Sequence, residues 1–251
     1  MSWRFRTVCV FVSVAAEIAA CVVRVSIGET MGVTTREFAS VDLDWWSDDG
    51  SEGGNWSLAS VLTVDFESRR LLAACRALSP GLLRVGGSRD VEARYAMDPF
   101  DEAWCKELHA FRGRNVSLCL GKQRIEQVLR FAQSAGLRLV WGLGYPGGYS
   151  RESTGVGDSV EVPAWNSSNA FSLLRYFRAR ADGGAVLFAV ELGEEMTPEP
   201  ASQSFAHLVA AYEALRAELD SLWPCSSEHT PLLVGPSAYS ASDREHRFVF
   251  R

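Results

Sequence analysis

The chain alternates between short apolar runs and longer stretches in which apolar residues recur with the spacing of a helix. Five runs have the length of buried strands and lie at residues 38–43, 82–85, 137–143, 185–190 and 232–234. Four amphipathic stretches between them predict helices, at residues 66–78, 123–135, 170–179 and 202–223. Repeated β-α units predict an α/β fold with a parallel sheet, either part of a (β/α) barrel or a doubly wound sheet.

Glycine follows most of the predicted strands, as at Gly86-Gly87, Gly193 and Gly235, where tight strand-to-helix turns need it. Segment 142–148 is also rich in glycine, but it contains proline and lacks a Lys-Ser/Thr pair. We therefore interpret it as a loop over the active-site face and not as a phosphate cradle. Neither a G-x-G-x-x-G run nor a G-x-S-x-G elbow occurs, so the sequence predicts no dinucleotide cofactor and no serine-hydrolase chemistry.

The 251 residues are 47% hydrophobic and 22% charged, the composition of an ordinary globular protein. A formal net charge of -6 and the lack of a basic, aromatic-rich run argue against a nucleic-acid partner. A polyanionic substrate remains compatible with that charge, because local patches matter more than the net value. The four histidines are scattered and no C-x-x-C pair is present, so no metal site is expected.

The first 20 residues have the pattern of a secretory signal peptide. Residues 1–6 carry positive charge, residues 7–20 are mainly apolar, and Ile18-Ala-Ala20 suits cleavage before Cys21. Glu17 and the short apolar stretch argue against a membrane-spanning helix, with an uncleaved anchor as the alternative. The sequence therefore predicts a secreted, lysosomal or vacuolar protein.

Glycosylation sequons and cysteines fit the same route. N-x-S/T sequons occur at Asn55, Asn115 and Asn166. Cys105 and Cys119 are candidates for a disulfide in an oxidising compartment, although nothing in the sequence fixes their pairing. Cys75 falls on the face of a predicted helix that we expect to be buried.

Acidic residues end the strand predicted at 185–190. Glu191, Glu194 and Glu195 follow within five residues of one another. The residues just past a parallel strand line the active-site face of α/β enzymes. A partly desolvated glutamate in that place can act as a general acid or base.

Five segments resemble the heparanase-type enzymes of glycoside hydrolase family 79, in the family's order and at ordinary spacings. Segments 185–196, 139–144 and 232–237 resemble the family's W-E-x-G-N-E-L, V-x-F-G-L-N and I-L-G-P-G stretches. Segment 38–46, FASVDLDWW, is similar to the plant heparanase-like F-x-x-A-T-L-D-W-W, and segment 78–88 is similar to L-S-P-x-x-I-R-x-G-G-S.

The resemblance implies a (β/α)8 barrel of which this chain holds about five units at residues 37–251. Residues 21–36 would be a linker or a strand of an incomplete β-sandwich, with segment 22–27 as that strand. The family's members are secreted or lysosomal β-glucuronidases that cleave uronic-acid glycans by a retaining mechanism. The chain is therefore expected to act on a glycan or proteoglycan, with no nucleic-acid partner and with an oligomeric state that the sequence does not give.

Residue roles follow from the same resemblance. Glu195 takes the acid/base position, while Asp44 and Ser88 match positions that contact the sugar. Glu194 stands where the family has Asn, whose side chain hydrogen-bonds a sugar hydroxyl. The nucleophile belongs to a later strand, beyond residue 251, so we expect no appreciable turnover from this chain alone.

Plainer interpretations stay open. The chain is alternatively an inactive secreted glycan-binding paralogue or a gene fragment, or a βα protein of unrelated function. Asp42 and Glu191 suit solvent exposure or structural salt bridges better than catalysis, and Arg84 suits a buried ion pair at least as well as substrate binding. Core packing is the default for each tryptophan near a strand end or loop, at Trp45, Trp46, Trp104 and Trp165.

Overall fold

The computed structural model describes residues 34–45, 60–87, 90, 93–99, 119–145, 165–180, 182, 184–194, 202–224 and 229–235. From residue 36 onward they belong to one compact unit, residues 36–251. In this described part, no helix is long and apolar enough to cross a membrane. The predicted signal peptide and the segment 22–27 lie outside the described residues.

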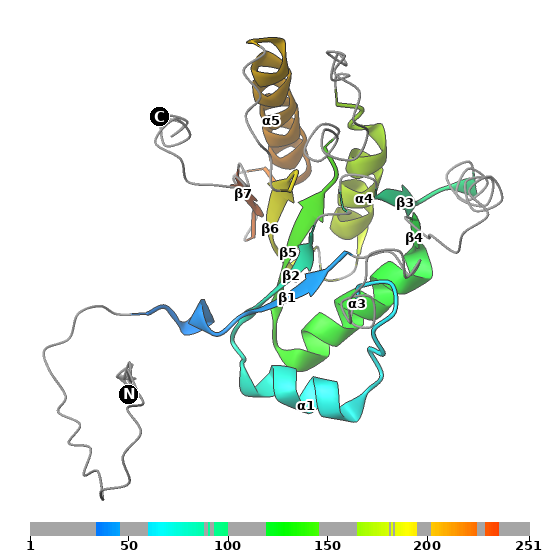
Figure 1. Cartoon of the computed structure of the whole chain (residues 1–251), viewed down its shortest axis with the longest axis vertical. Helices are drawn as coiled ribbons and strands as arrows, with labels where there is room; N and C mark the ends of the chain where they lie inside the picture. Colours follow the sequence, from blue (N-terminus) through cyan, green and yellow to red (C-terminus); the bar gives the residue numbers. More distant parts are fainter. Residues whose placement is uncertain are drawn as a thin grey trace, which may run out of the picture. The chain divides into compact units, whose positions relative to one another are not determined.

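Five parallel strands form the main sheet, in the same order as along the chain (Figure 1). They are β1 (Val41–Asp44), β2 (Leu82–Gly86), β5 (Arg138–Leu143), β6 (Leu187–Leu192) and β7 (Leu232–Val234). A doubly wound sheet reverses its strand order at a switch point, and this sheet has no such reversal. The topology is therefore compatible with successive units of a TIM-type barrel, with β1 and β7 at the two edges of the described sheet.

Within the described residues, four helices lie between the strands, in two neighbouring pairs. They are α1 (Arg69–Ala77), α3 (Lys122–Ala135), α4 (Ser168–Ala179) and α5 (Ser202–Leu222). Helix α1 packs against α3, and α4 packs against α5 (Figure 1). The side chain of Ser68 caps α1 by accepting from the Leu71 amide at 3.4 Å. Gly136 ends α3 in the left-handed conformation, at φ 69°.

The two faces of the sheet differ sharply. Residues on one face, such as Val85, Trp141 and Val190, are fully buried in a core shared with the helices. Neighbouring positions on the other face pair Asp42 with Arg84 and Gly142 with Glu191. Right-handed crossovers between strands in sequential order place every helix on the same face. The helix-free face is therefore the one that holds the polar residues, which is how the fold positions a site.

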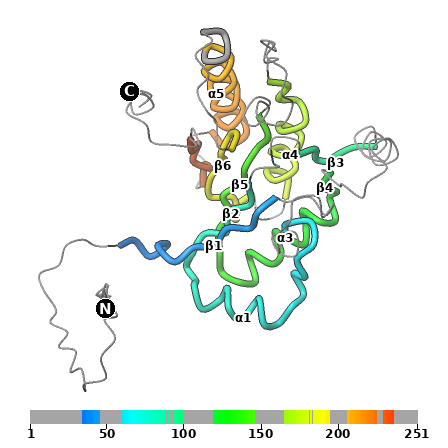
Figure 2. Tube along the Cα trace, in the orientation of Figure 1, coloured from blue at the N-terminus to red at the C-terminus, as the bar shows by residue number. Residues whose placement is uncertain are grey.

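A second, two-stranded sheet was not predicted from the sequence. It pairs β3 (Arg94–Ala96) with β4 (Cys119–Gly121) in parallel, and it lies beside α4 (Figure 2). The amide of Asn169 on α4 bonds both backbone groups of Tyr95, accepting from its N–H and donating to its carbonyl at 2.8 Å each.

The strands and helices predicted from residue 38 onward are all present in the described part of the chain, with ends within three residues of the predicted ones. The largest errors are at two N-terminal boundaries. Residues 36–38 form a 3₁₀ turn with Phe38 70% exposed, and the strand begins only at Val41. Likewise α1 begins at Arg69, because the residues before it form turns that contribute Phe66 to the core.

Candidate active site

Acidic side chains from separate strands gather at the carboxyl edge of the main sheet. Asp44 is the last residue of β1, and Glu191 and Glu194 lie at the end of β6 and just beyond it. Because the strands are parallel, these ends share one edge of the sheet. Asp44 and Glu194, two of the predicted site residues, thus lie at the same edge of the sheet.

Arg84 on β2 is the central cation of this edge. Its Nε donates to Glu191 Oε2 at 2.7 Å and its Nη1 donates to Asp42 Oδ1 at 3.2 Å. Its Nη2 donates to Glu194 Oε2. Burial lowers the pKa of the guanidinium, but Glu191 above all, then Glu194 and Asp42, outweigh burial and raise that pKa. The structural ion-pair interpretation of Arg84, Glu191 and Asp42 is confirmed.

Two glycines make room for this cluster. A Cβ atom at Gly86 would lie 2.9 Å from the guanidinium carbon of Arg84, so the side chain of Arg84 folds over this glycine. Gly87 has φ +122°, and a Cβ atom there would overlap the carboxylate of Asp44. The Gly-Gly pair after β2 is therefore needed for space as well as for the turn.

Asp90 is a site residue that the sequence analysis missed. It is fully buried, and within the described part of the chain neither carboxyl oxygen has a hydrogen-bond partner. Burial first, then the charges of Glu194, Glu191 and Asp44, raise its pKa to about 8, with Arg84 acting in the opposite direction. Asp90 is therefore mostly uncharged at neutral pH. The one available signal was its place two residues after Ser88, behind the same strand.

Asp90 rests on Gly142, which belongs to β5. A Cβ atom at Gly142 would lie 2.6 Å from Asp90 Oδ2 and 3.1 Å from the Cα atom of Gly86. The carboxyl of Asp90 thus lies on the helix-free face, the face of Arg84 and Glu191. Any larger residue at position 142 would occupy the space of that carboxyl.

Three buried aromatic side chains pack together beside Gly142. Tyr95 donates its hydroxyl to the Gly142 carbonyl at 3.1 Å, and Trp141 donates its indole N–H to the Tyr95 hydroxyl at 3.3 Å. Trp45 packs edge-on against both rings, with centroids at 5.9 and 6.4 Å. Burial raises the pKa of Tyr95, so it stays a neutral donor. For Trp45 the core interpretation is confirmed, since it is 0% exposed.

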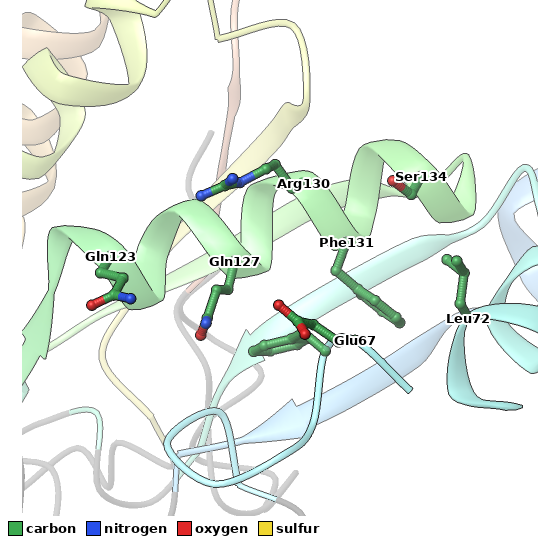
Figure 3. Close-up of a pocket in the computed structure, with 8 residues that line it drawn as sticks. Glu67, Leu72, Gln123, Gln127, Arg130, Phe131 and Ser134 are labelled. Carbon is green, nitrogen blue, oxygen red and sulfur yellow. The ribbon is translucent and has the colours of Figure 1, made fainter. Parts of the chain in front are cut away.

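A pocket elsewhere in the unit does not involve these groups. It has a volume of about 390 Å³ and lies between α3 and the segment that leads into α1 (Figure 3). Its lining includes Phe66, Gln127 and Phe131 and shares no residue with the strand-end cluster. Because it lies on the helix-covered side of the sheet, it is not the candidate active site.

Other predicted residues divide into described and undescribed ones. Asn166 is exposed, and its Oδ1 accepts from the Ser168 hydroxyl at 2.7 Å. Cys75 is buried with a free thiol whose pKa burial raises, and Cys119 takes part in a disulfide. Among the described residues no cluster suited to a metal ion occurs. Four predicted site residues lie outside the described residues, namely Ser88, Glu195, Asn55 and Asn115.

Carboxylates at the ends of parallel strands, with helices on the opposite face, are typical of α/β enzymes that work at the carboxyl edge of a barrel. The comparison with known families gives the particular member of this class. Residues 20–249 match the family description "Glycosyl hydrolase family 79, N-terminal domain". The chain belongs to glycosyl hydrolase family 79.

Two curated relatives come from Arabidopsis thaliana. The chain is 27% identical to heparanase-like protein 3 over 171 residues, which is 66% of this chain and 30% of that protein. It is 23% identical to heparanase-like protein 1 over 216 residues, or 82% of this chain and 38% of that protein. The chain thus spans about a third of the length of these relatives.

Proposed function

We propose that this chain is the barrel portion of a heparanase-type glycoside hydrolase that cleaves O-glycosyl bonds of uronic-acid glycans. Family membership over residues 20–249 supports a glycosidase and a glycan substrate. The observation that supports this edge as the site is the ion pair between Arg84 on β2 and Glu194 just beyond β6, with Asp44 at the end of β1 on the same edge. Sites on barrels are built in this way, from several strand ends.

The proposed mechanism is retention of configuration by two carboxyl groups. Such enzymes need an acid/base and a nucleophile about 5–5.5 Å apart. We assign the acid/base role to Glu195, which directly follows Glu194 behind β6. We assign sugar contacts to Asp44 and Ser88, and we expect another strand of the complete barrel to supply the nucleophile. The complete reaction is therefore a proposal about the full-length protein.

Glu194 marks a departure from the family pattern, which has Asn at this position. An ionised Glu accepts hydrogen bonds but cannot donate one to a sugar hydroxyl. Its ion pair with Arg84 offsets part of its charge, so its effect on the neighbouring Glu195 is smaller than the sequence alone indicates. This residue favours a second candidate function, a secreted glycan-binding protein without turnover.

Entry into the secretory route is part of the proposal. The exposed side chain of Asn166, in contact with the hydroxyl of its sequon residue Ser168, supports N-glycosylation at that position. Expression in a eukaryotic host should give a product cleaved after Ala20 whose mass falls on deglycosylation. An Asn166→Gln variant with the same mass shift as the parent protein contradicts this site.

Hydrolysis and binding assays separate the two functions. The full-length protein is tested for release of 4-nitrophenol from a β-glucuronide and for binding to uronic-acid oligosaccharides. Turnover that Glu195→Gln abolishes supports the hydrolase. Binding without turnover supports the glycan-binding alternative. If neither glycan nor glucuronide binds, both proposals are wrong.

A further inference from the structure

Trp165 lies beside the carboxyl edge of the sheet, shortly before α4. Its indole N–H donates to the carbonyl of Gly144 at 2.9 Å, and Gly144 directly follows β5. The carbonyl of Leu143, one residue earlier, accepts from the N–H of Gly193 at 2.9 Å, and Gly193 precedes Glu194. Trp165 is therefore linked through two neighbouring strand ends to the acidic residues of the candidate active site.

Two contacts fix the orientation of this side chain. The hydrogen bond to Gly144 holds the polar end of the indole, and the ring of Phe171 packs edge-on against it, with ring centroids 5.7 Å apart at 86°. Phe171 belongs to the first turn of α4, which Asn169 ties to the backbone of Tyr95. The indole is therefore preorganised, and a ligand that contacts it orders no loose side chain.

The surface of the ring is what Trp165 offers to a ligand. It packs against the core and yet stays partly exposed, unlike Trp45, Trp141 and Trp223, which are at most 2% exposed. Because the one N–H of its side chain is already bonded to the protein, the indole has no hydrogen bond to give. A ligand here must present an apolar surface to the ring. A pyranose does so through the C–H groups of one face, while its hydroxyls stay free for polar partners.

We propose that Trp165 is the platform for a second sugar unit of the glycan, next to the unit that the carboxyl edge of the sheet holds for hydrolysis. This inference rests on the proposed function, because it assigns a further sugar position to the same edge. The platform is uncharged, so it accepts a pyranose ring with or without a carboxylate. Its effect is to raise the affinity for a chain of sugars over that for a single sugar.

Ligands of two lengths test the platform. Methyl β-glucuronide and a tetrasaccharide of alternating glucuronic acid and N-acetylglucosamine are titrated by calorimetry into the full-length protein carrying Glu195→Gln, so that hydrolysis does not consume the ligand. Trp165→Ala should weaken tetrasaccharide binding about tenfold, the value of one aromatic contact. Binding of methyl β-glucuronide should change by less than about twofold, because this ligand does not reach the platform.

A conservative variant separates a sugar platform from a structural role. Trp165→Phe keeps an aromatic face and loses the N–H that bonds Gly144, so it should weaken tetrasaccharide binding only about threefold or less. Equal losses in Trp165→Phe and Trp165→Ala would show that the hydrogen bond to Gly144 is what matters, and they would overturn the proposal.

Tryptophan emission gives a readout that a purely structural role does not move. A sugar that covers an exposed indole removes water from it and shifts its emission to shorter wavelength. We expect this shift when the tetrasaccharide binds, and Trp165→Phe should lack it. Trp223→Phe is the matched control and should keep the shift, since Trp223 is 2% exposed. A shift that persists in Trp165→Phe, or that is lost equally in Trp223→Phe, contradicts the platform.

A glycan on the chain itself is the other source of a sugar ring at this place. Asn166 directly follows Trp165 and is the proposed glycosylation position. The titrations are therefore repeated with Asn166→Gln, which carries no glycan there. If this change alone moves the emission of Trp165 to longer wavelength, the chain's own sugar covers the ring and the substrate platform is wrong.

The same titrations keep the two proposals apart. If the tetrasaccharide binds the parent protein and Trp165→Ala with equal affinity, the platform is wrong while the proposed function stands. If neither sugar binds the parent protein, the proposed function fails with the platform.

Discussion

Replacing Arg84 by methionine should be among the most destabilising changes in this chain. Methionine has a similar length and no charge, so the change removes the ion pairs while keeping most of the packing. Glu191 and Glu194 then lose their cationic partner at side-chain exposures of 11% and 13%. Removing one partner of a buried ion pair leaves an uncompensated charge and typically costs about 3–5 kcal/mol.

The ion pair with Asp42, which is exposed, adds little to this loss of stability. Asp42 keeps 54% of its side-chain surface in water, and exposed pairs are typically worth about 0–1 kcal/mol. We therefore expect Arg84→Met to lower the free energy of unfolding by about 3–5 kcal/mol, a third or more of the stability of a typical domain. The double variant Arg84→Met with Glu191→Gln should recover part of the loss, because it removes the charge of a carboxylate that had paired with Arg84.

Urea unfolding at pH 7, followed by the fluorescence of the buried tryptophans, measures these changes. The matched control is Arg216→Met, which removes an exposed pair with Asp220 on α5 and should cost about 0.3–0.5 kcal/mol. A loss in Arg84→Met no larger than in this control would refute the reasoning, because the strand-end carboxylates would then be stable without their cation. Failure of the double variant to recover any stability would contradict the assignment to Glu191.

Three further substitutions, at Asp90, Gly142 and Glu194, test the strand-end site. Asp90 holds its proton up to a pKa of about 8 in the folded state and loses it near 3.9 when unfolded, so wild-type stability falls between these pH values by up to about 1.4 kcal/mol per pH unit. Asp90→Asn should lack this fall, and urea unfolding at pH 4, 6 and 8 checks it. Gly142→Ala would place a methyl group 2.6 Å from Asp90 Oδ2, so we expect a loss of about 1–3 kcal/mol. Gly121→Ala, with nothing within 4 Å of the added Cβ, is its control and should cost less than about 1 kcal/mol. Glu194→Asn in the full-length protein restores a donor to the sugar hydroxyl and should raise glucuronide turnover about tenfold, the equivalent of one hydrogen bond. Unchanged or lower turnover in steady-state kinetics would contradict the damaged-site account of Glu194.

The alternation of apolar and polar residues predicted most of the fold. A strand such as β5 is buried at four of its six positions, and a helix such as α3 shows its apolar stripe at Ile125, Val128 and Leu129, so each leaves a signal in the sequence. The order of these elements, joined by right-handed crossovers, then limits the topology to a few choices. The pair β3 and β4 was not predicted, because it is held by the side chain of Asn169 and by pairing between strands far apart in sequence.

The site could be predicted only where its residues directly end a strand. Asp44 and Glu194 follow apolar runs, so their place at the carboxyl edge follows from the parallel order. The pairing of Arg84 with Glu194 does not, because it depends on contact across β5 between residues 110 positions apart. Local sequence shows a charge, but it does not show which opposite charge will lie beside it.

Burial gives the Asp90 carboxyl a raised pKa that its residue type alone does not predict. In the sequence it is one acid among many, and a turn aspartate ordinarily lies in water. Here Gly142 leaves it a space on the sheet, and the neighbouring acids make its ionised form costly. The carboxyl group of Asp90 is therefore protonated and uncharged near the carboxylates of Asp44, Glu191 and Glu194. Its pKa is therefore a property of the packing of β1, β2, β5 and β6, and a single substitution at Gly142 would alter the charge of the site without touching any acid.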